Sequence, residues 1–234
     1  MSRRSLASVA SVLGWVATLA SVAGAQTPVP LGPAFTVDTT SGYLEHPKIA
    51  VDGDGDLMIV WRRDSSEIRG RLFEGDTTPV GSDFVVNDPS VYASNSFDSS
   101  DGIQDVASDG AGGFVVVFNA NEYVPTSCLG LECVFSRRYE DAGTAGPQLI
   151  VQPTAYPIPF QAGNVEIAGN GLGTFVAAWE GYDSSGEGVF GRTTAADGSA
   201  VSPEFQANET EAGYQGDRGW LDVAGGPAGD KNND

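Results

Sequence analysis

The chain has 234 residues, with 31 acidic residues against 12 Lys and Arg, and a formal net charge of −19 at pH 7. So acidic a chain argues against nucleic acid and anionic membranes as partners, because both attract positive charge. Its length suits one domain or a stack of repeats.

The N-terminus has the features of an export signal. Arg3 and Arg4 form a basic start, an apolar stretch follows, and residues 23–25 form an A-x-A cleavage motif. We therefore expect residues 1–25 to be a signal peptide and residues 26–234 to be secreted, periplasmic or on the cell surface. The arginine pair also partly matches a twin-arginine signal, so the pattern leaves the export route open. No second hydrophobic segment of membrane length follows, so we expect no membrane span after signal removal.

An internal repeat organises the rest of the chain. IAVDGDGDLMIVW at 49–61 is followed by VASDGAGGFVVVF at 106–118 and IAGNGLGTFVAAW at 167–179, and a fourth copy begins at 223–230. Each copy has a short apolar segment, a Gly-rich turn, an apolar run and a closing aromatic residue. We interpret the chain as full repeats at about 39–88, 89–152 and 153–208, with partial repeats at 28–38 and 209–234.

Each repeat predicts four strands. In the first repeat we expect three of them at about 48–51, 56–61 and 68–73, and a fourth that holds Phe84. The second strand is a continuous apolar run, which is suited to burial on both faces. The third strand alternates between apolar and charged residues, as a strand with one buried face does.

This cycle of four strands predicts the fold class. We expect an all-β protein, a β-propeller-like array of four-stranded antiparallel blades. A β-sandwich is the alternative, but its strands would not recur in a four-strand cycle. Three whole repeats are few for a closed ring, so we expect the array to be incomplete and the sequence to be a fragment of a longer protein.

Two strings carry a resemblance to a known kind of protein. VASDGAGGFVVVF and FVAAWEGYDSSGEGVFGRTTAADGSAVSPEFQAN resemble the tandem β-propeller-type repeats of large secreted bacterial proteins. The resemblance covers most of residues 28–230, and the third repeat matches best. It implies an extracellular repeat protein, sometimes one related to the cell surface or to adhesion, and it implies no catalytic residues.

The two cysteines, Cys128 and Cys133, lie close together in the second repeat. Since an exported protein meets oxidising conditions, we expect them to form a loop-closing disulfide. A zinc site is the alternative, but it needs further ligands, and the chain has a single histidine, His46. A hydrolase triad also needs a partnered base. We therefore expect His46 to be a turn or interface residue.

Three aspartates, Asp52, Asp54 and Asp56, alternate in the first Gly-rich turn. Three close carboxylates attract hard cations, so a calcium site private to the first repeat is the one cofactor that the sequence suggests. An EF-hand is excluded, because its sixth and twelfth positions would be Leu57 and Arg63. We interpret the stretch first as a hairpin turn built on glycine, in which aspartate is only tolerated.

Three arginines occupy the same place in the third strand of each repeat. We expect a blade-to-blade salt bridge or a surface role for them, rather than a catalytic arginine cluster. They are Arg71, Arg137 and Arg192.

Variable loops mark one face of the expected array as the face that carries its binding function. The loops between second and third strands, and those between repeats, differ in length and composition, and such loops on a rigid scaffold commonly carry function. They hold aromatic residues near Asp and Asn, which suits recognition of an extracellular glycan or protein. The candidate ligand-binding residues are Tyr92, Tyr123, Tyr156, Tyr182, Tyr214 and Trp220.

The sequence thus predicts a non-catalytic protein with an extracellular binding or surface-interaction role. The alternative is a propeller-fold glycoside hydrolase or lyase that acts on extracellular polysaccharide. Its active residues would lie in further blades or among the loop carboxylates and arginines.

Overall fold

The computed structural model describes residues 32–64, 67–93, 103–122, 132–152, 163–182, 187–209 and 222–224. Contacts within the chain divide it into two units, Met1–Ala34 and Phe35–Asp234. The fold described here is that of the second unit.

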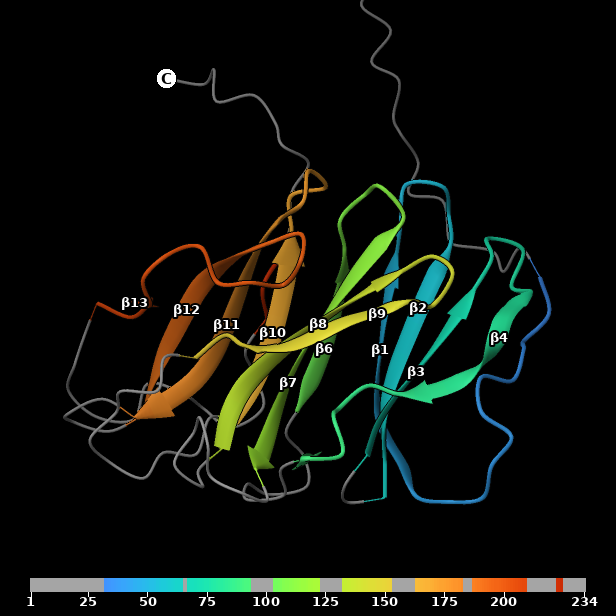
Figure 1. Ribbon diagram of the computed structural model, residues 1–234, viewed down its shortest axis with the longest axis horizontal. Helices are drawn as coiled ribbons and strands as arrows, with labels where there is room; N and C mark the ends of the chain where they lie inside the picture. Colours follow the sequence, from blue (N-terminus) through green and yellow to red (C-terminus); the bar gives the residue numbers. More distant parts are fainter. Residues whose placement is uncertain are drawn as a thin grey trace, which may run out of the picture. The chain divides into compact units, whose positions relative to one another are not determined.

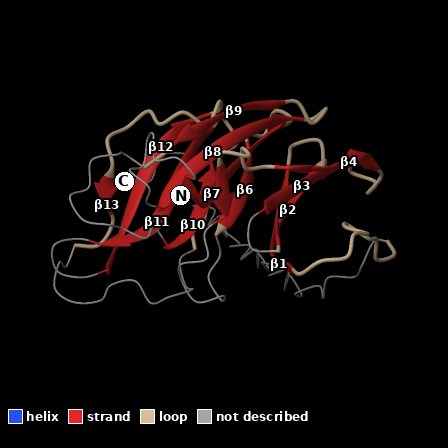
Figure 2. Cartoon of the chain, turned by 60° about the horizontal axis from the view of Figure 1, so that its bottom comes forward, coloured by secondary structure: helices blue, strands red, loops and turns tan. Residues whose placement is uncertain are grey.

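Phe35–Asp234 is all-β: its described residues form three antiparallel sheets and no helix (Figures 1 and 2). The first sheet has the order β1 (Leu44–Val51), β2 (Leu57–Arg63), β3 (Glu67–Phe73), β4 (Pro79–Val85). The second contains β5 (Val91–Ala93), β6 (Gln104–Ser108), β7 (Gly113–Glu122), β8 (Glu132–Glu140) and β9 (Ala145–Ile150). The third has the order β10 (Gly163–Gly169), β11 (Thr174–Tyr182), β12 (Glu187–Ala195), β13 (Phe205–Gln206). Within the described ranges, no helix has the length and hydropathy that crossing a membrane requires.

Each sheet has four strand positions in chain order. In the second sheet, β5 and β6 share the first position, because β6 pairs with Phe114–Phe118 of β7 and β5 pairs with Ala120–Glu122. We name the sheets the first, second and third blade, and the four positions the inner, second, third and outer strand. The predicted four-strand cycle is therefore confirmed, and the β-sandwich alternative is wrong, since each repeat builds its own complete sheet.

The apolar runs form the second strands because both of their faces are covered. Val60 of β2 and Val116 of β7 belong to one buried cluster between the first and second blades. Val115, which points to the other face of β7, packs in another cluster with Phe175 of β11. Neighbouring blades thus stack face to face, and the described residues form the predicted β-propeller-like array of four-stranded blades.

The repeated arginines of the third strands join neighbouring blades. The predicted blade-to-blade role is confirmed, but each guanidinium donates to a backbone carbonyl of the preceding outer-strand segment instead of forming a salt bridge. The bonds run from Arg71 to Val37 at 2.8 Å, from Arg137 to Val86 at 2.9 Å and from Arg192 to Val151 at 2.7 Å.

An Asx side chain closes each turn between an inner and a second strand. The Oδ1 atoms of Asp52, Asp109 and Asn170 each accept hydrogen bonds from the backbone N–H groups two and four residues further on. The prediction that aspartate is only tolerated here is wrong for the first turn position. An Asx residue is needed there because it satisfies two turn N–H groups.

The glycines of these turns allow neighbouring blades to approach closely. A Cβ atom on Gly53 would lie 2.9 Å from the carbonyl oxygen of Gly110. A Cβ atom on Gly110 would lie 2.7 Å from the carbonyl oxygen of Gly171. The repeated glycine is therefore required by blade stacking as well as by the turn itself.

Two predictions fall partly or wholly outside the described residues. The signal peptide at 1–25 lies outside them, as does Cys128. Cys133 is buried in β8, opposite Ala120 of β7. The disulfide, the signal peptide and the repeat boundaries stay predictions.

Candidate functional site

Ionisable side chains occupy one equivalent position in all three inner strands. The residues are Lys48 in β1, Asp105 in β6 and Glu166 in β10, which we call the hub. Their equivalence is shown by the register: each pairs with the same position of its second strand, namely Val60, Val117 and Ala178. The residues on either side of that position in each second strand are apolar, so the hub places charge beside an apolar stretch of each repeat.

The hub residues contact one another across blades. The Lys48 ammonium forms an ion pair with the Glu166 carboxylate, which joins the first blade to the third. Asp105 accepts a hydrogen bond from the Ile167 backbone N–H at 2.9 Å, and its side chain also shares a hydrogen bond with Glu166. Asp105 is 8% exposed, and the side chains of Glu166 and Lys48 are 13% and 31% exposed. The cluster is thus largely buried but open to solvent on the lysine side.

The environment of Glu166 favours its protonated form. Burial, together with the hydrogen bond and charge of Asp105, raises the pKa of Glu166 to about 7, although Lys48 acts in the opposite direction. At neutral pH the hub therefore combines an ammonium donor, a carboxylate acceptor and a carboxyl group that gains and loses its proton. Such a set can donate to and accept from the hydroxyl groups of a ligand.

Bulges lie next to the hub in two of the three blades. His46 and Asn164 each stand two residues before a hub residue, and both have positive φ, 51° and 27°. The pairing register shifts at both places. Bulges turn a strand locally and re-aim the side chains that follow, and they are common beside functional sites. The His46 carbonyl also accepts a bond from Gln104 of the second blade, so His46 lies at a blade interface.

The predicted ligand-binding aromatic residues lie only partly within the described structure. Tyr92 is in β5 and Tyr182 ends β11, and both backbones lie at the end of their sheets where the inner strands begin. Their side chains and the four other predicted residues are outside the described part of the chain: Tyr123, Tyr156, Tyr214 and Trp220. The binding role of all six stays a prediction.

The predicted calcium ligands serve the first turn. Asp52 accepts from two turn N–H groups, and Asp56 accepts from the Gly75 backbone N–H at 2.9 Å. Within the ranges that the structure describes, no group of three or more His, Cys, Asp or Glu residues is arranged to hold a metal ion. This turn follows the C-terminal end of β1, whereas the residues before Lys48 are at its N-terminal end. A calcium site with Asp54 stays a prediction.

The hub was missed because its residues differ in type. The sequence repeat begins at Ile49, Val106 and Ile167, one residue after each hub residue. Extending the alignment by one position would have placed Lys, Asp and Glu in register and added Asp222 before the fourth copy.

A second carboxyl group with a buried oxygen lies outside the hub. Glu204 stands before Phe205, as Asp83 stands before Phe84 in the first blade. Asp83 forms an ion pair with Arg69, but the register places Phe190 at the corresponding place in the third blade. The Glu204 Oε2 atom has no hydrogen-bond partner, and burial raises the pKa of Glu204 to about 7.

We expect the protein to lose stability as pH rises from about 5 to 8. Glu166 and Glu204 have a pKa raised from 4.5 to about 7 in the folded chain, so the folded state holds protons that the unfolded state has released in this window. The free energy of unfolding therefore falls between these values. Urea unfolding at pH 5, 6, 7 and 8 measures the effect.

The variant Glu204→Gln should flatten this decline, whereas Glu74→Gln, an exposed residue in the turn after β3, should leave it unchanged. Stability that is constant or rises across the window would contradict the assignment.

Comparisons with known proteins find similarity to solved structures alone. No protein-family model matches it, and neither does any curated protein sequence. Among solved structures it is similar to the GH43 endo-arabinanase from Bacillus licheniformis, with a TM-score of 0.38, 13% identity, and 67% of this chain and 56% of that one covered. It is also similar to the α-L-arabinanase from Penicillium chrysogenum solved with arabinobiose, with a TM-score of 0.33, 11% identity, and 70% and 66% covered. The chain thus spans less than two thirds of the length of either enzyme.

Proposed function

We propose that the protein binds an extracellular polysaccharide at the hub, without turning it over. The single observation that carries this proposal is the register: three consecutive inner strands place Lys48, Asp105 and Glu166 at one equivalent position, in contact with one another. Even a paired buried charge adds little net stability, so a purely structural core gains little from the Lys48–Glu166 pair. A buried carboxyl group whose pKa is raised by burial and by a neighbouring carboxylate, as that of Glu166 is, is a candidate for a functional site.

The chemistry of the hub suits a hydroxyl-rich ligand. The carboxylates accept hydrogen bonds from hydroxyl groups, and the lysine donates to ring or hydroxyl oxygens. A formal net charge of −19 disfavours anionic polymers, which leaves neutral polysaccharides as the favoured class. The predicted aromatic loops adjoin the end where the inner strands begin, and aromatic faces stack on sugar rings.

The spacing of the two carboxyl groups favours binding over hydrolysis. Two-carboxylate glycosidases hold these groups about 5 to 9.5 Å apart, so that a sugar or a water fits between them. Asp105 and Glu166 instead lie within hydrogen-bonding reach of one another, which is closer than this range. Hydrolysis is the second candidate, because a Glu166 pKa of about 7 suits a general acid. A second carboxylate would then have to come from another residue. Asp222 is the candidate, because it stands one residue before the fourth copy of the repeat, as the hub residues stand before the first three copies.

Binding to a panel of polysaccharides tests the proposal. Isothermal titration calorimetry with arabinan, xylan and a mixed-linkage glucan, and with polygalacturonate as the anionic counterpart, should show binding to a neutral polymer. We expect Glu166→Gln and Lys48→Met to weaken that binding about tenfold to a hundredfold, since each removes a charged hydrogen-bonding group.

Glu74→Gln is the matched control, because it changes a carboxylate to an amide in the exposed turn after β3, outside the hub. Thermal melts of each variant separate binding from folding. If the hub is only a tie between blades, Glu166→Gln will lower the melting temperature and leave affinity unchanged, which would contradict the proposal. Release of reducing sugar by the wild type would favour the second candidate.

A further inference from the structure

One blade face is covered less completely than its counterparts, because its second strand is buried but its inner strand is exposed. The front face of the first blade carries Arg69 and Arg71 of β3, and its apolar residues include Ile49, Leu57, Ile59, Trp61 and Phe73. The equivalent faces of the second and third blades are buried against the back of the preceding blade.

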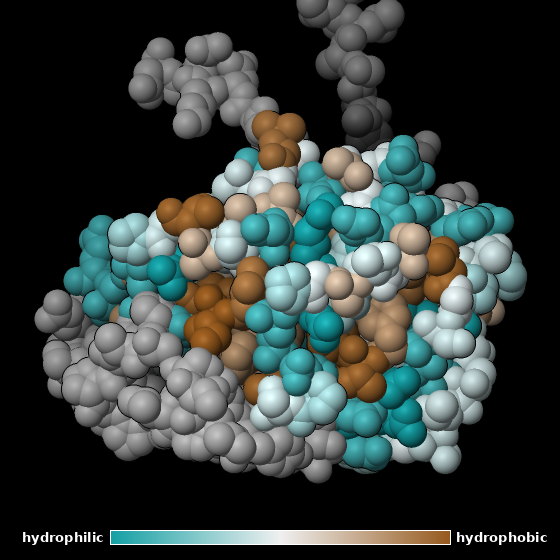
Figure 3. All heavy atoms as spheres, viewed as in Figure 1, coloured by the Kyte–Doolittle hydropathy of each residue, from teal (hydrophilic) through white to brown (hydrophobic). Residues whose placement is uncertain are grey.

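Exposure shows the difference between these faces. Ile49 is 57% exposed, whereas its counterparts Val106 and Ile167 are 5% and 4% exposed. Exposed hydrophobic residues in several patches interrupt a largely hydrophilic surface (Figure 3). Contiguous apolar patches commonly mark interaction sites. The covered faces of the second and third blades show what this surface is shaped to receive.

Residues 35–38 stand in the place of the outer strand of a preceding blade. Arg71 donates to the Val37 carbonyl as Arg137 donates to Val86, which follows the outer strand β4. Phe35 packs on Phe73 with ring centroids 5.2 Å apart. Among the described residues, no strand pairs with residues 35–38. Among the described residues, the place of a third strand beside this segment therefore holds no strand.

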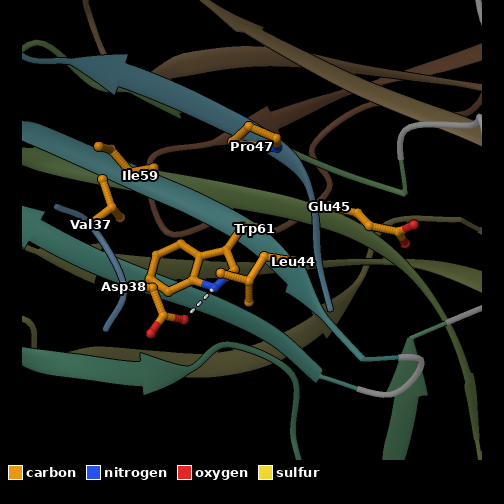
Figure 4. Close-up of a pocket in the computed structure, with 7 residues that line it drawn as sticks. All are labelled: Val37, Asp38, Leu44, Glu45, Pro47, Ile59 and Trp61. Atoms are coloured by element: carbon orange, nitrogen blue, oxygen red, sulfur yellow. Dashed lines mark hydrogen bonds between the residues drawn. The ribbon is translucent and has the colours of Figure 1, made fainter. Parts of the chain in front are cut away.

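A hollow of about 190 Å³ lies at this place (Figure 4). Its lining is mostly apolar, and the two polar groups near the indole are already engaged. The Trp61 indole N–H donates to Asp38 at 3.2 Å, and the Glu45 carboxylate turns away to Arg62 at 2.8 Å (Figure 4). The hollow thus offers apolar contact and leaves the backbone edge of residues 35–38 to supply hydrogen bonds. Its lining is Val37, Asp38, Leu44, Glu45, Pro47, Ile59 and Trp61.

We propose that the front face of the first blade binds an extended polypeptide strand, which pairs with residues 35–38 and places alternate apolar side chains on the face. This is β-strand addition to an exposed edge. The partner has the chemistry of a third strand such as β3, whose Ile68 and Leu72 pack in the cluster that covers the second blade. This proposal is independent of the polysaccharide site.

Two of the three blades, the first and the third, suggest the register of the bound strand; in the second, Ser136 lies opposite Leu149. In the first blade Gly70 lies opposite Phe84, and in the third Gly191 lies opposite Phe205. A Cβ atom on Gly70 would lie 2.9 Å from the Phe84 ring. Phe35 takes the place of these phenylalanines, so the bound strand needs a glycine opposite it, flanked by apolar residues two positions away on each side.

A peptide with the sequence of residues 67–73 is the probe. Its two arginines and one glutamate also complement the acidic protein. Fluorescence anisotropy of the labelled peptide against the full chain should show saturable binding. Replacing the peptide glycine (Gly70→Val), or both apolar residues by serine, should weaken binding about tenfold or more.

Two protein variants locate the binding face. Ile49→Lys should weaken binding about tenfold or more, because it puts a charge in the apolar contact. Leu172→Lys is the control, since Leu172 is 72% exposed in a turn of the third blade. No saturable binding, or binding that Ile49→Lys leaves unchanged, would overturn the proposal. So would sedimentation that shows wild-type dimers abolished by Ile49→Lys, because the face would then receive a second copy.

Discussion

Replacing Gly110 by alanine is expected to destabilise the protein by about 3 kcal/mol, because two separate costs add at this residue. Its φ is +74°, where an L-residue is disfavoured by about 1–2 kcal/mol. The new Cβ atom would also lie 2.7 Å from the carbonyl oxygen of Gly171 in the next blade. Relieving such a contact shifts backbone and costs about 1–3 kcal/mol. Urea unfolding followed by circular dichroism measures the sum.

Two further glycines separate the contributions. Gly81 also has φ +74°, but nothing lies within 4 Å of its Cβ position. Gly81→Ala should therefore lower the free energy of unfolding only by the cost of the positive φ, about 1 kcal/mol. Gly53 has no positive φ, but its Cβ would lie 2.9 Å from the Gly110 oxygen, so Gly53→Ala should lose only the contact part. If Gly110→Ala is no worse than Gly81→Ala, the close stacking of the turns is wrong.

Replacing Arg137 by methionine is expected to destabilise the protein by about 3 kcal/mol, since two hydrogen bonds from a charged donor are lost. The guanidinium donates to the Gly146 carbonyl within its own blade and to the Val86 carbonyl of the preceding blade, both at 2.9 Å. Methionine keeps the alkyl contact and removes both donors. Lysine should restore only part of the loss, because an ammonium lacks the planar fork that reaches both oxygens.

Arg63→Met is the matched control for this variant. The Arg63 guanidinium lies 3.9 Å from the Asp64 carboxylate at the end of β2, and exposed pairs of this kind contribute little, about 0.5 kcal/mol or less. Hydrogen exchange adds a second readout. Arg137→Met should raise exchange in both β4 and β8, whereas an effect confined to β8 would contradict a role between blades.

The sequence predicted the fold because the structural demands of a blade recur along the chain. Apolar second strands are buried on both faces in every blade, and the arginine of each third strand meets the same carbonyl of the segment before it. A residue pattern that every blade needs therefore recurs in all three repeats of the sequence, where it can be recognised. The turn glycines were predicted for the same reason, although their contact with the next blade depends on distances that a sequence does not contain.

The hub could not be predicted in this way because its three positions hold different residues. Lys48, Asp105 and Glu166 share a register and a location, and their contact depends on how blades far apart in the chain stack together. The aspartates of the first turn attracted attention by their type, yet Asp52 has the same local capping role as Asn170. A recurring position with changing charged residues, inside an otherwise repeated apolar motif, is the signal to search for in such chains.

The most direct test of the hub is a crystal structure of the protein soaked with an oligosaccharide of the neutral polymer that it binds best. The proposed function predicts sugar hydroxyl groups within hydrogen-bond distance of the Asp105 and Glu166 carboxyl groups, with the lysine shifted toward the ligand. A sugar bound elsewhere on the chain, with the Lys48–Glu166 ion pair undisturbed, would contradict it.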